Sequence, residues 1–326
     1  EDRGDRLDTN ELLKQALSGS PQALGRLISL VEDASPLLRE VTAALAPYAG
    51  RAHVVGITGA PGVGKSTSTS AVVARLRERG LRVGVLAVDP SSPFSGGALL
   101  GDRVRMQEHA TDPHVFIRSM ASRGHLGGLS WATPQAVRVL DAAGCDVVLV
   151  ETVGVGQSEV EVAGAADTTV VLLAPGMGDG VQAAKAGILE IGDLFVVNKA
   201  DRDGADATLR ELRHMLTLGS GPRSGPAEDP WAPPVLRTVA AKGEGSEEVV
   251  EALMAHRAWL ERTGELVARR RARAAAEVEA IAFGMLRDRM GDLRGDQHVD
   301  VLAGRVVDGD LDPYAAADAL VAGLSL

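Results

Sequence analysis

Residues 59–66 read G-A-P-G-V-G-K-S and fit the pattern G-x-x-x-x-G-K-[ST]. Glycines at these positions let successive backbone amides face one anion, the lysine reaches terminal phosphates, and the closing hydroxyl suits Mg²⁺. An apolar stretch precedes the run and a helical pattern over residues 66–78 follows it, so the positive end of a helix would point at the same place. This context favours a phosphate-binding loop over a glycine-rich turn that fits the pattern by chance.

Residues 198–201 read N-K-A-D and indicate which base accompanies the phosphates. In N-K-x-D the aspartate accepts hydrogen bonds from N1–H and N2–H of guanine, which adenine cannot donate. Residues 240–242, A-A-K, follow the last predicted strand and fit the short loop whose backbone amide meets guanine O6. We therefore predict GTP and GDP as ligands. The predicted nucleotide-binding residues are Gly59, Ala60, Pro61, Gly62, Val63, Gly64, Lys65, Ser66, Thr67, Gly154, Asn198, Lys199, Asp201, Ala240, Ala241 and Lys242.

Three carboxylates are candidates for a magnesium site. Asp89 ends the second predicted strand and Asp102 follows a glycine-containing stretch; for each taken alone, a loop cap explains the aspartate as well as a metal role does. Glu151 stands at the tip of an apolar strand, with Gly154 three residues later. That order is typical of a γ-phosphate sensor, in which the carboxylate holds the metal and the glycine amide approaches the phosphate. Because glutamate is longer than the aspartate of most such proteins, we expect Glu151 to reach Mg²⁺ mainly through water.

The residues that would catalyse hydrolysis form an incomplete set. Val155 follows Gly154 where many GTPases have a water-positioning glutamine, and Gln157 would substitute only after a rearrangement. Lys185 lies beyond a glycine-rich turn and is one of five lysines among 34 basic residues, although a surface lysine is the simpler reading of that residue alone. We expect slow intrinsic hydrolysis that a partner or a moving loop completes. The predicted catalytic residues are Lys65, Glu151, Gln157 and Lys185.

The composition excludes several classes of protein. The net charge of −10 argues against nucleic-acid binding, and the arginine-rich residues 269–273 are interpreted as a solvated helix face. Cys145 is the only cysteine, which excludes an internal disulfide and a Cys-x-x-Cys metal site and favours a reducing compartment. No apolar run approaches the ~18 residues of a membrane span. The acidic start resembles neither a signal nor a transit peptide, so a cytoplasmic location is expected, although the sequence begins with Glu1 and an upstream segment could have been removed.

Short β-branched runs alternate with helical stretches from residue 53 onward. This alternation implies right-handed crossovers and an α/β fold with a doubly wound, mostly parallel sheet, whose ligands bind at the carboxyl ends of the strands. With 45% hydrophobic but only 3% aromatic residues, the core should be aliphatic. The predicted strands are residues 53–58, 82–88, 115–119, 146–151, 168–174, 194–198 and 235–239.

Helical patterns flank this region on both sides. We predict a helical extension over residues 1–50, a P-loop GTPase domain over residues 51–255 and a helical dimerisation arm over residues 256–326. A long helical pattern covers residues 247–290, with apolar residues on more than one face, and a short final helix is predicted over residues 313–324. The histidines show no metal-ligand spacing, and His109 and His114 are expected at the surface.

Together these residues resemble a known family, the methylmalonyl-CoA mutase accessory GTPases of the MeaB, MMAA and ArgK type. The resemblance covers roughly residues 10–290 and is carried by residues 59–66, 89–94, 101–103, 151–159, 175–179 and 198–201. It implies a homodimeric GTPase that gates adenosylcobalamin delivery to methylmalonyl-CoA mutase and protects or reactivates that enzyme, with dimerisation through the C-terminal helices. It also implies Mg²⁺ near Ser66, Asp89, Asp102 and Glu151, and a mobile loop that carries Lys185 to the active site.

Two alternative functions remain open. A metal-delivery accessory GTPase for another metalloenzyme should show cysteine or histidine metal motifs, and a lone Cys145 argues against it. A P-loop kinase of the ArgK type would need an acceptor pocket, which the sequence does not reveal, and N-K-x-D argues for a guanine nucleotide. Co-purification with a cobalamin-dependent mutase would distinguish the accessory GTPase from both.

Overall fold

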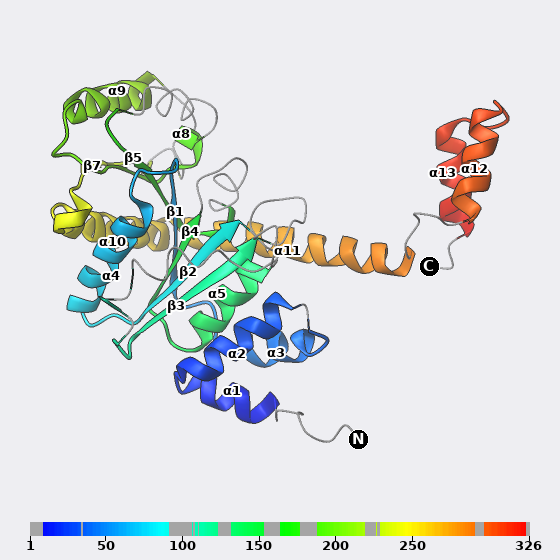
Figure 1. Ribbon diagram of the computed structural model, residues 1–326, viewed down its shortest axis with the longest axis horizontal. Coiled ribbons are helices and arrows are strands. Elements are labelled where there is room, and N and C mark those ends of the chain that lie inside the picture. The colour runs from blue at the N-terminus through cyan, green and yellow to red at the C-terminus, as the bar shows by residue number, and fades with distance from the viewer. Residues whose placement is uncertain are drawn as a thin grey trace. The chain divides into compact units, whose positions relative to one another are not determined.

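Seven strands form one sheet in the order β3-β2-β4-β1-β5-β6-β7, and every neighbouring pair is parallel (Figure 1). Strands β2, β3 and β4 lie on one side of β1, and β5, β6 and β7 lie on the other. The predicted doubly wound parallel sheet is therefore confirmed, and each predicted run forms a strand whose bounds agree with the prediction to within three residues. The strands are β1 (His53–Thr58), β2 (Val83–Pro90), β3 (Val115–Ser122), β4 (Val147–Thr152), β5 (Thr168–Leu173), β6 (Leu194–Val197) and β7 (Val235–Arg237).

This computed structural model describes residues 9–33, 35–90, 106, 108–109, 111–122, 132–152, 164–176, 188–218, 226, 229–290 and 297–323. The chain divides into two compact units, Glu1–Val267 and Ala268–Leu326. The first unit contains the whole sheet and the second contains C-terminal helices. The division into an extension, a GTPase domain and a dimerisation arm at residues 50 and 255 remains a prediction.

Helices cover both faces of the sheet because alternate residues of each buried strand point to opposite faces. In β4, Val148 and Val150 belong to an apolar cluster that also contains residues of α1, α2, α3 and α5, whereas Leu149 belongs to one that contains residues of α4 and α10. The core that results is mostly aliphatic, as the composition predicted. The helices that the structure describes in this unit before α11 (Glu265–Met290) are α1 (Thr9–Leu17), α2 (Pro21–Glu32), α3 (Leu38–Leu45), α4 (Lys65–Glu78), α5 (Ala132–Ala142), α8 (Ile188–Ile191), α9 (Ala205–Leu218), a 3-10 helix (Ala240–Lys242) and α10 (Ser246–Thr263).

Side-chain contacts fix the N-terminal helices to the sheet. The apolar stripe of α2 is buried, and Ser20 caps this helix by accepting a hydrogen bond from the amide of Ala23. Arg118 of β3 donates to Ser29 Oγ at 3.0 Å and pairs with the carboxylate of Glu32 at 2.5 Å. Helix α2 therefore packs against β3, which is the edge strand of the sheet.

Buried polar contacts at the amino ends of the strands hold α10 in place. Thr168 Oγ1 lies 2.7 Å from His53 Nε2 and 2.8 Å from His256 Nδ1. The other ring nitrogen of His256 faces Asp193 at 3.4 Å, and Trp259 stacks against the same ring. Further along, α10 packs against α4. The helix that leads out of the first unit is thus anchored to the sheet and to the helix after the glycine-rich loop.

The helical pattern over residues 247–290 forms two helices rather than one. Gly264 separates α10 from α11 (Glu265–Met290) and has a φ of 79°, a left-handed conformation that ends a helix readily only at glycine. Apolar positions recur on both sides of this glycine, so the sequence pattern did not mark the break.

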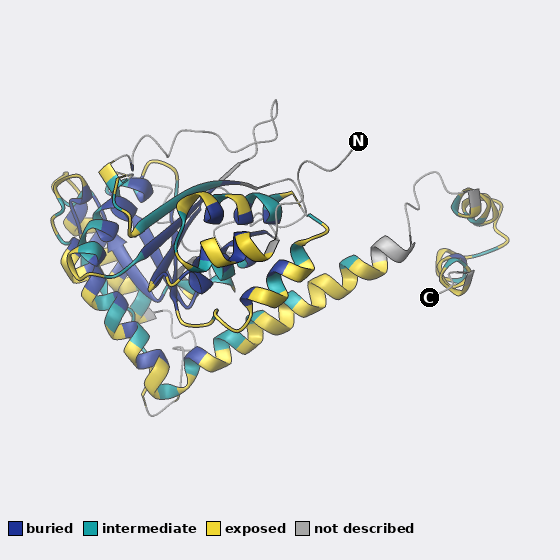
Figure 2. Cartoon of the chain, turned by 90° about the horizontal axis from the view of Figure 1, so that it is seen from below, coloured by how far each residue is buried: buried dark blue, intermediate teal, exposed yellow. Residues whose placement is uncertain are grey.

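The second unit has little core of its own. Besides the greater part of α11 it contains α12 (Gln297–Val307), which the sequence did not predict, and α13 (Pro313–Gly323), and these two helices pack against each other. Ala316 is the one buried hydrophobic residue in the described part of this unit. Figure 2 shows its helices mostly exposed. Among the residues that the structure describes, no helix is long and apolar enough to cross a membrane.

Candidate nucleotide-binding site

The loop between β1 and α4 contains three glycines whose backbone conformations other residues rarely adopt. Gly59, Gly62 and Gly64 have φ values of 146°, 81° and 95°. A Cβ on Gly59 would lie 2.4 Å from the carbonyl oxygen of Leu172 in β5, and one on Gly64 would lie 2.5 Å from Asn198 Nδ2. The loop is therefore held against β5 on one side and against the N-K-A-D segment on the other.

The first turn of α4 places Lys65 over this loop. Its Nζ donates to the carbonyl oxygens of Gly59 at 2.8 Å and Ala60 at 3.2 Å, and the residue is 8% exposed. Thr67 follows in the same turn and is half-buried. A buried lysine at a helix amino terminus that lies against a glycine-rich loop is the arrangement that binds polyphosphate.

Glu151 at the end of β4 meets two hydroxyl groups of α4. Ser66 Oγ donates to Oε1 at 2.7 Å, and Thr69 Oγ1 lies 2.8 Å from Oε2. Glu151 is 3% exposed. A hydroxyl and a carboxylate brought together beside the phosphate loop are hard oxygen donors, and their chemistry fits Mg²⁺.

The structure does not test the remaining metal and catalytic candidates. Asp89 lies in β2, where its backbone pairs with that of Ala121, but its side chain is outside the described residues. The candidates outside those residues altogether are Asp102, Gly154, Gln157 and Lys185. In the described part of the chain, no group of three or more His, Cys, Asp or Glu residues could hold a metal ion. Ser66 and Glu151 are thus the two candidate metal residues that are seen together.

Asn198 joins three segments around the loop. Its Nδ2 donates to the carbonyl of Val63 at 2.8 Å, and its Oδ1 accepts from the amide of Ala240 at 3.0 Å and from Thr238 Oγ1 at 3.1 Å. The side chain is buried. One amide group therefore ties the phosphate loop to the 3-10 helix that contains Ala240, exposed Ala241 and Lys242.

Two lysines border the place where Asp201 would meet the base. Lys199 has a φ of 56° and donates to the carbonyl of Gly62 at 2.6 Å. Lys242 Nζ lies 3.2 Å from Asp201 Oδ2. The hydrogen bond from Lys242 is the main cause that lowers the pKa of Asp201 below its ordinary value. Asp201 is therefore held in the ionised form, which accepts hydrogen bonds and donates none.

Comparison with known proteins agrees with this geometry. The family described as "Methylmalonyl Co-A mutase-associated GTPase MeaB" matches residues 24–293. The chain belongs to the MeaB family. It is accordingly a P-loop GTPase, as the sequence predicted. A protein of Pyrococcus abyssi is 48% identical over 313 residues, which cover 96% of this chain and 95% of that protein.

Two further relatives of this MeaB family member carry more specific names. The methylmalonic aciduria type A homolog, mitochondrial, of Caenorhabditis elegans is 38% identical over 279 residues, which cover 81% of this chain and 69% of that protein. The crystal structure of a LAO/AO transport system kinase superposes with a TM-score of 0.72 at 27% identity and covers 99% of both chains. The second match supports the P-loop fold.

The MeaB-type site contains residues that sequence reasoning missed. Thr69 contacts Glu151, and Thr238 holds Asn198. Thr69 follows Ser66 by three positions, a spacing that places both side chains on one helix face, so this signal was present in the sequence.

His109 was wrongly expected at the surface. Its side chain is 11% exposed and its Nε2 lies 2.9 Å from Ser70 Oγ of α4, whereas His114 is exposed.

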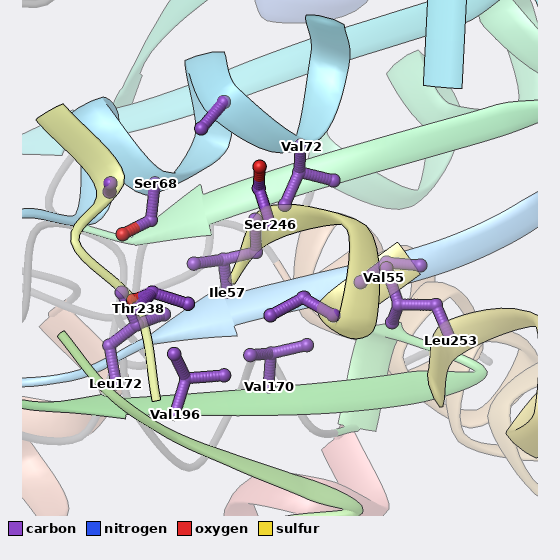
Figure 3. A pocket seen from close by; sticks show the side chains of 13 residues that line it. Val55, Ile57, Ser68, Val72, Val170, Leu172, Val196, Thr238, Ser246 and Leu253 are labelled. Atoms are coloured by element: carbon purple, nitrogen blue, oxygen red, sulfur yellow. The ribbon is translucent and has the colours of Figure 1, made fainter. Parts of the chain in front are cut away.

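A small apolar cavity lies behind α4, between the sheet and α10 (Figure 3). Its volume of ≈ 20 Å³ is room for roughly one water molecule. Ser68, Thr238 and Ser246 supply the few polar groups among lining residues that are otherwise aliphatic. A cavity this small cannot hold a phosphate acceptor beside a nucleotide.

Proposed function

We propose that this chain is a GTP-hydrolysing chaperone that gates adenosylcobalamin delivery to methylmalonyl-CoA mutase and protects or reactivates that enzyme. The observation that carries the proposal is the continuous set of contacts from Glu151 through the phosphate loop to Asn198, in a chain of the family described as mutase-associated. The name of the C. elegans relative, which refers to methylmalonic aciduria, supports the same client.

Each described residue of the site has a part in this proposal. The loop amides and Lys65 would bind the phosphates, and Asp201 would accept N1–H and N2–H of guanine. Ser66 would hold Mg²⁺, with Glu151 reaching the ion through water. Bound Mg²⁺ would neutralise charge that develops between the β- and γ-phosphates. Since Glu151 and Ser66 are buried together, they would be held ready before hydrolysis begins.

We propose further that methylmalonyl-CoA mutase, when it binds, completes the catalytic site of this chain. Val155 stands where many GTPases have a water-positioning glutamine, and Lys185 and Gln157 lie outside the described residues. A cation brought to the γ-phosphate accelerates related reactions strongly. Lys185 would supply that cation when the mutase binds.

Single-turnover GTP hydrolysis with and without the mutase tests this function. We expect the mutase to accelerate hydrolysis by about tenfold or more, and Lys185→Ala to lose that acceleration. Lys14→Ala, which removes an exposed lysine of α1, should be accelerated like the parent. A rate that the mutase does not change, with no complex on size-exclusion chromatography, would contradict the proposal.

The second unit is proposed to form the dimer interface. Val278, Ile281 and Met285 recur at helical spacing on α11, and they are 66%, 51% and 41% exposed. Deletion of residues 268–326 should give a monomer in sedimentation velocity that still binds GDP, because the described contacts of the loop come from the first unit. A full-length protein that sediments as a monomer at micromolar concentration would rule out this interface.

The two alternatives receive less support from the described residues. A metal-delivery function has no ligand cluster there. The name of the structural relative suggests a kinase function for that protein. In this chain the cavity behind α4 is too small to hold a phosphate acceptor. The accessory GTPase therefore remains the function that the geometry supports best.

A further inference from the structure

Thr69 lies outside both nucleotide motifs, yet it contacts the acid of the proposed site. Its Oγ1 is 2.8 Å from Glu151 Oε2, while Ser66 Oγ is 2.7 Å from the other carboxylate oxygen. Ser66 and Thr69 are three residues apart on α4 and both are buried, at 5% and 0% exposure. One face of α4 therefore presents two hydroxyl groups to the two oxygens of one carboxylate.

The proton of the Thr69 hydroxyl has two acceptors within reach. The carbonyl of Lys65 is 3.0 Å away, but it lies in the first turn of α4, where the amide four residues later is its helical partner. A carboxylate only accepts hydrogen bonds, and a bond to an ionised acceptor is the stronger one. The proton is therefore assigned to the contact with Glu151.

Ser66 and Thr69 differ in what else they do. Ser66 ends the phosphate-loop motif and would hold Mg²⁺, so its hydroxyl is shared between the ion and Glu151. Thr69 lies one turn further into α4 and has no place at the phosphates. A glutamate also has one more side-chain torsion than the aspartate common at this position, so the backbone of β4 alone fixes its carboxylate less well.

We propose that Thr69 is a positioning residue for Glu151, whose hydroxyl fixes one carboxylate oxygen so that the other stays directed at Ser66 and the magnesium site. The inference rests on the proposed GTPase site. It adds Thr69, which belongs neither to the phosphate-loop pattern nor to the pattern of an acid at a strand tip followed by a glycine.

Three variants of the full chain separate this role from packing. Thr69→Val keeps the shape and removes the hydroxyl, whereas Thr69→Ser keeps the hydroxyl and removes the methyl group. Ser68→Ala is the matched control, because Ser68 Oγ has no hydrogen-bond partner among the described residues and Ser68 lines the cavity behind α4 (Figure 3). If Thr69→Val does not fold, Thr69→Ala takes its place.

The first measurement is the release of a fluorescent GDP analogue as a function of Mg²⁺ concentration. For Thr69→Val we expect the half-saturating Mg²⁺ concentration to rise about tenfold, as loss of one charge-assisted hydrogen bond predicts, while GDP affinity in EDTA stays within about twofold. Single-turnover GTP hydrolysis should fall about tenfold. Thr69→Ser and Ser68→Ala should behave as the parent does.

The outcomes distinguish this inference from the function on which it rests. Parental Mg²⁺ dependence and rate in Thr69→Val would overturn the positioning role alone, as would a Thr69→Ser variant that is equally impaired, because packing would then explain both. A parent protein that binds no GDP, or releases it independently of Mg²⁺, would overturn the site together with the inference.

Discussion

Replacing Glu151 with glutamine is expected to slow GTP hydrolysis about 10²- to 10³-fold while GDP affinity changes by less than about tenfold. The carboxylate accepts from Ser66 on one oxygen and faces Thr69 on the other. Glutamine offers one acceptor oxygen and an NH₂ group, so one of the two hydroxyls would meet a donor. The substitution also removes the negative charge of Glu151 beside the proposed Mg²⁺ site, where we expect that charge to be needed during hydrolysis of the γ-phosphate. Single-turnover hydrolysis and equilibrium GDP binding measure the two effects separately.

The control for this substitution is Glu32→Gln. Glu32 is also largely buried, with a side chain 14% exposed, but it pairs with Arg118 between α2 and β3. Its replacement should leave turnover unchanged. If Glu151 and Thr69 act as one unit, Thr69→Val should add little to the loss caused by Glu151→Gln. Unchanged turnover in the Glu151 variant would remove that residue from the site.

The sequence predicted those parts of the fold that depend on residues close together in the chain. Glycines that must adopt positive φ, an acid at the tip of an apolar strand and β-branched runs between helices each leave a signal within a few residues. For that reason the seven strands and the phosphate loop were predicted, and Asn198 and Asp201 were placed correctly beside a strand end. Strand ends differed because sheet pairing rather than propensity sets where a strand stops.

The contacts that were not predicted depend on how elements meet. Residues 66–70 read S-T-S-T-S. Helical spacing puts Ser66 and Thr69 on one face, but nothing local says which face meets Glu151. The packing of α4 against β4 turns Ser66 and Thr69 toward Glu151 but leaves Ser68 at the cavity. Thr238 likewise acquires its role only because β7 ends beside Asn198. The roles of Asp89, Asp102, Gly154, Gln157 and Lys185 remain predictions.

The side chain of Asn198 connects the part of the site that would bind the base with the part that would bind the phosphates. Asn198 bonds to the phosphate loop at Val63 and to the 3-10 helix at Ala240, so the segment that carries Asp201 cannot move without disturbing the loop. Lys199, which donates to Gly62, adds a second link. Base recognition should therefore contribute to the affinity for the whole nucleotide rather than only to the choice of base.

Asp201→Asn is expected to lower GTP affinity about 10²- to 10⁴-fold, because two charge-assisted hydrogen bonds to guanine are lost. Xanthine has a carbonyl where guanine has its N2 amine, and the asparagine amide can donate to that oxygen. The variant should therefore gain affinity for xanthosine triphosphate. Isothermal titration calorimetry of parent and variant with each nucleotide in turn measures both dissociation constants without a guanine-based probe.

Asp203→Asn is the matched control for this exchange. Asp203 lies two residues further along the same exposed turn, so the substitution changes the local charge by the same amount without touching the residue that would meet the base. It should bind GTP as the parent does. If the Asp201 variant also binds GTP unchanged, or if the parent binds ATP as tightly as GTP, Asp201 does not read the base. If both variants weaken binding equally, the local charge rather than hydrogen bonding would account for the loss.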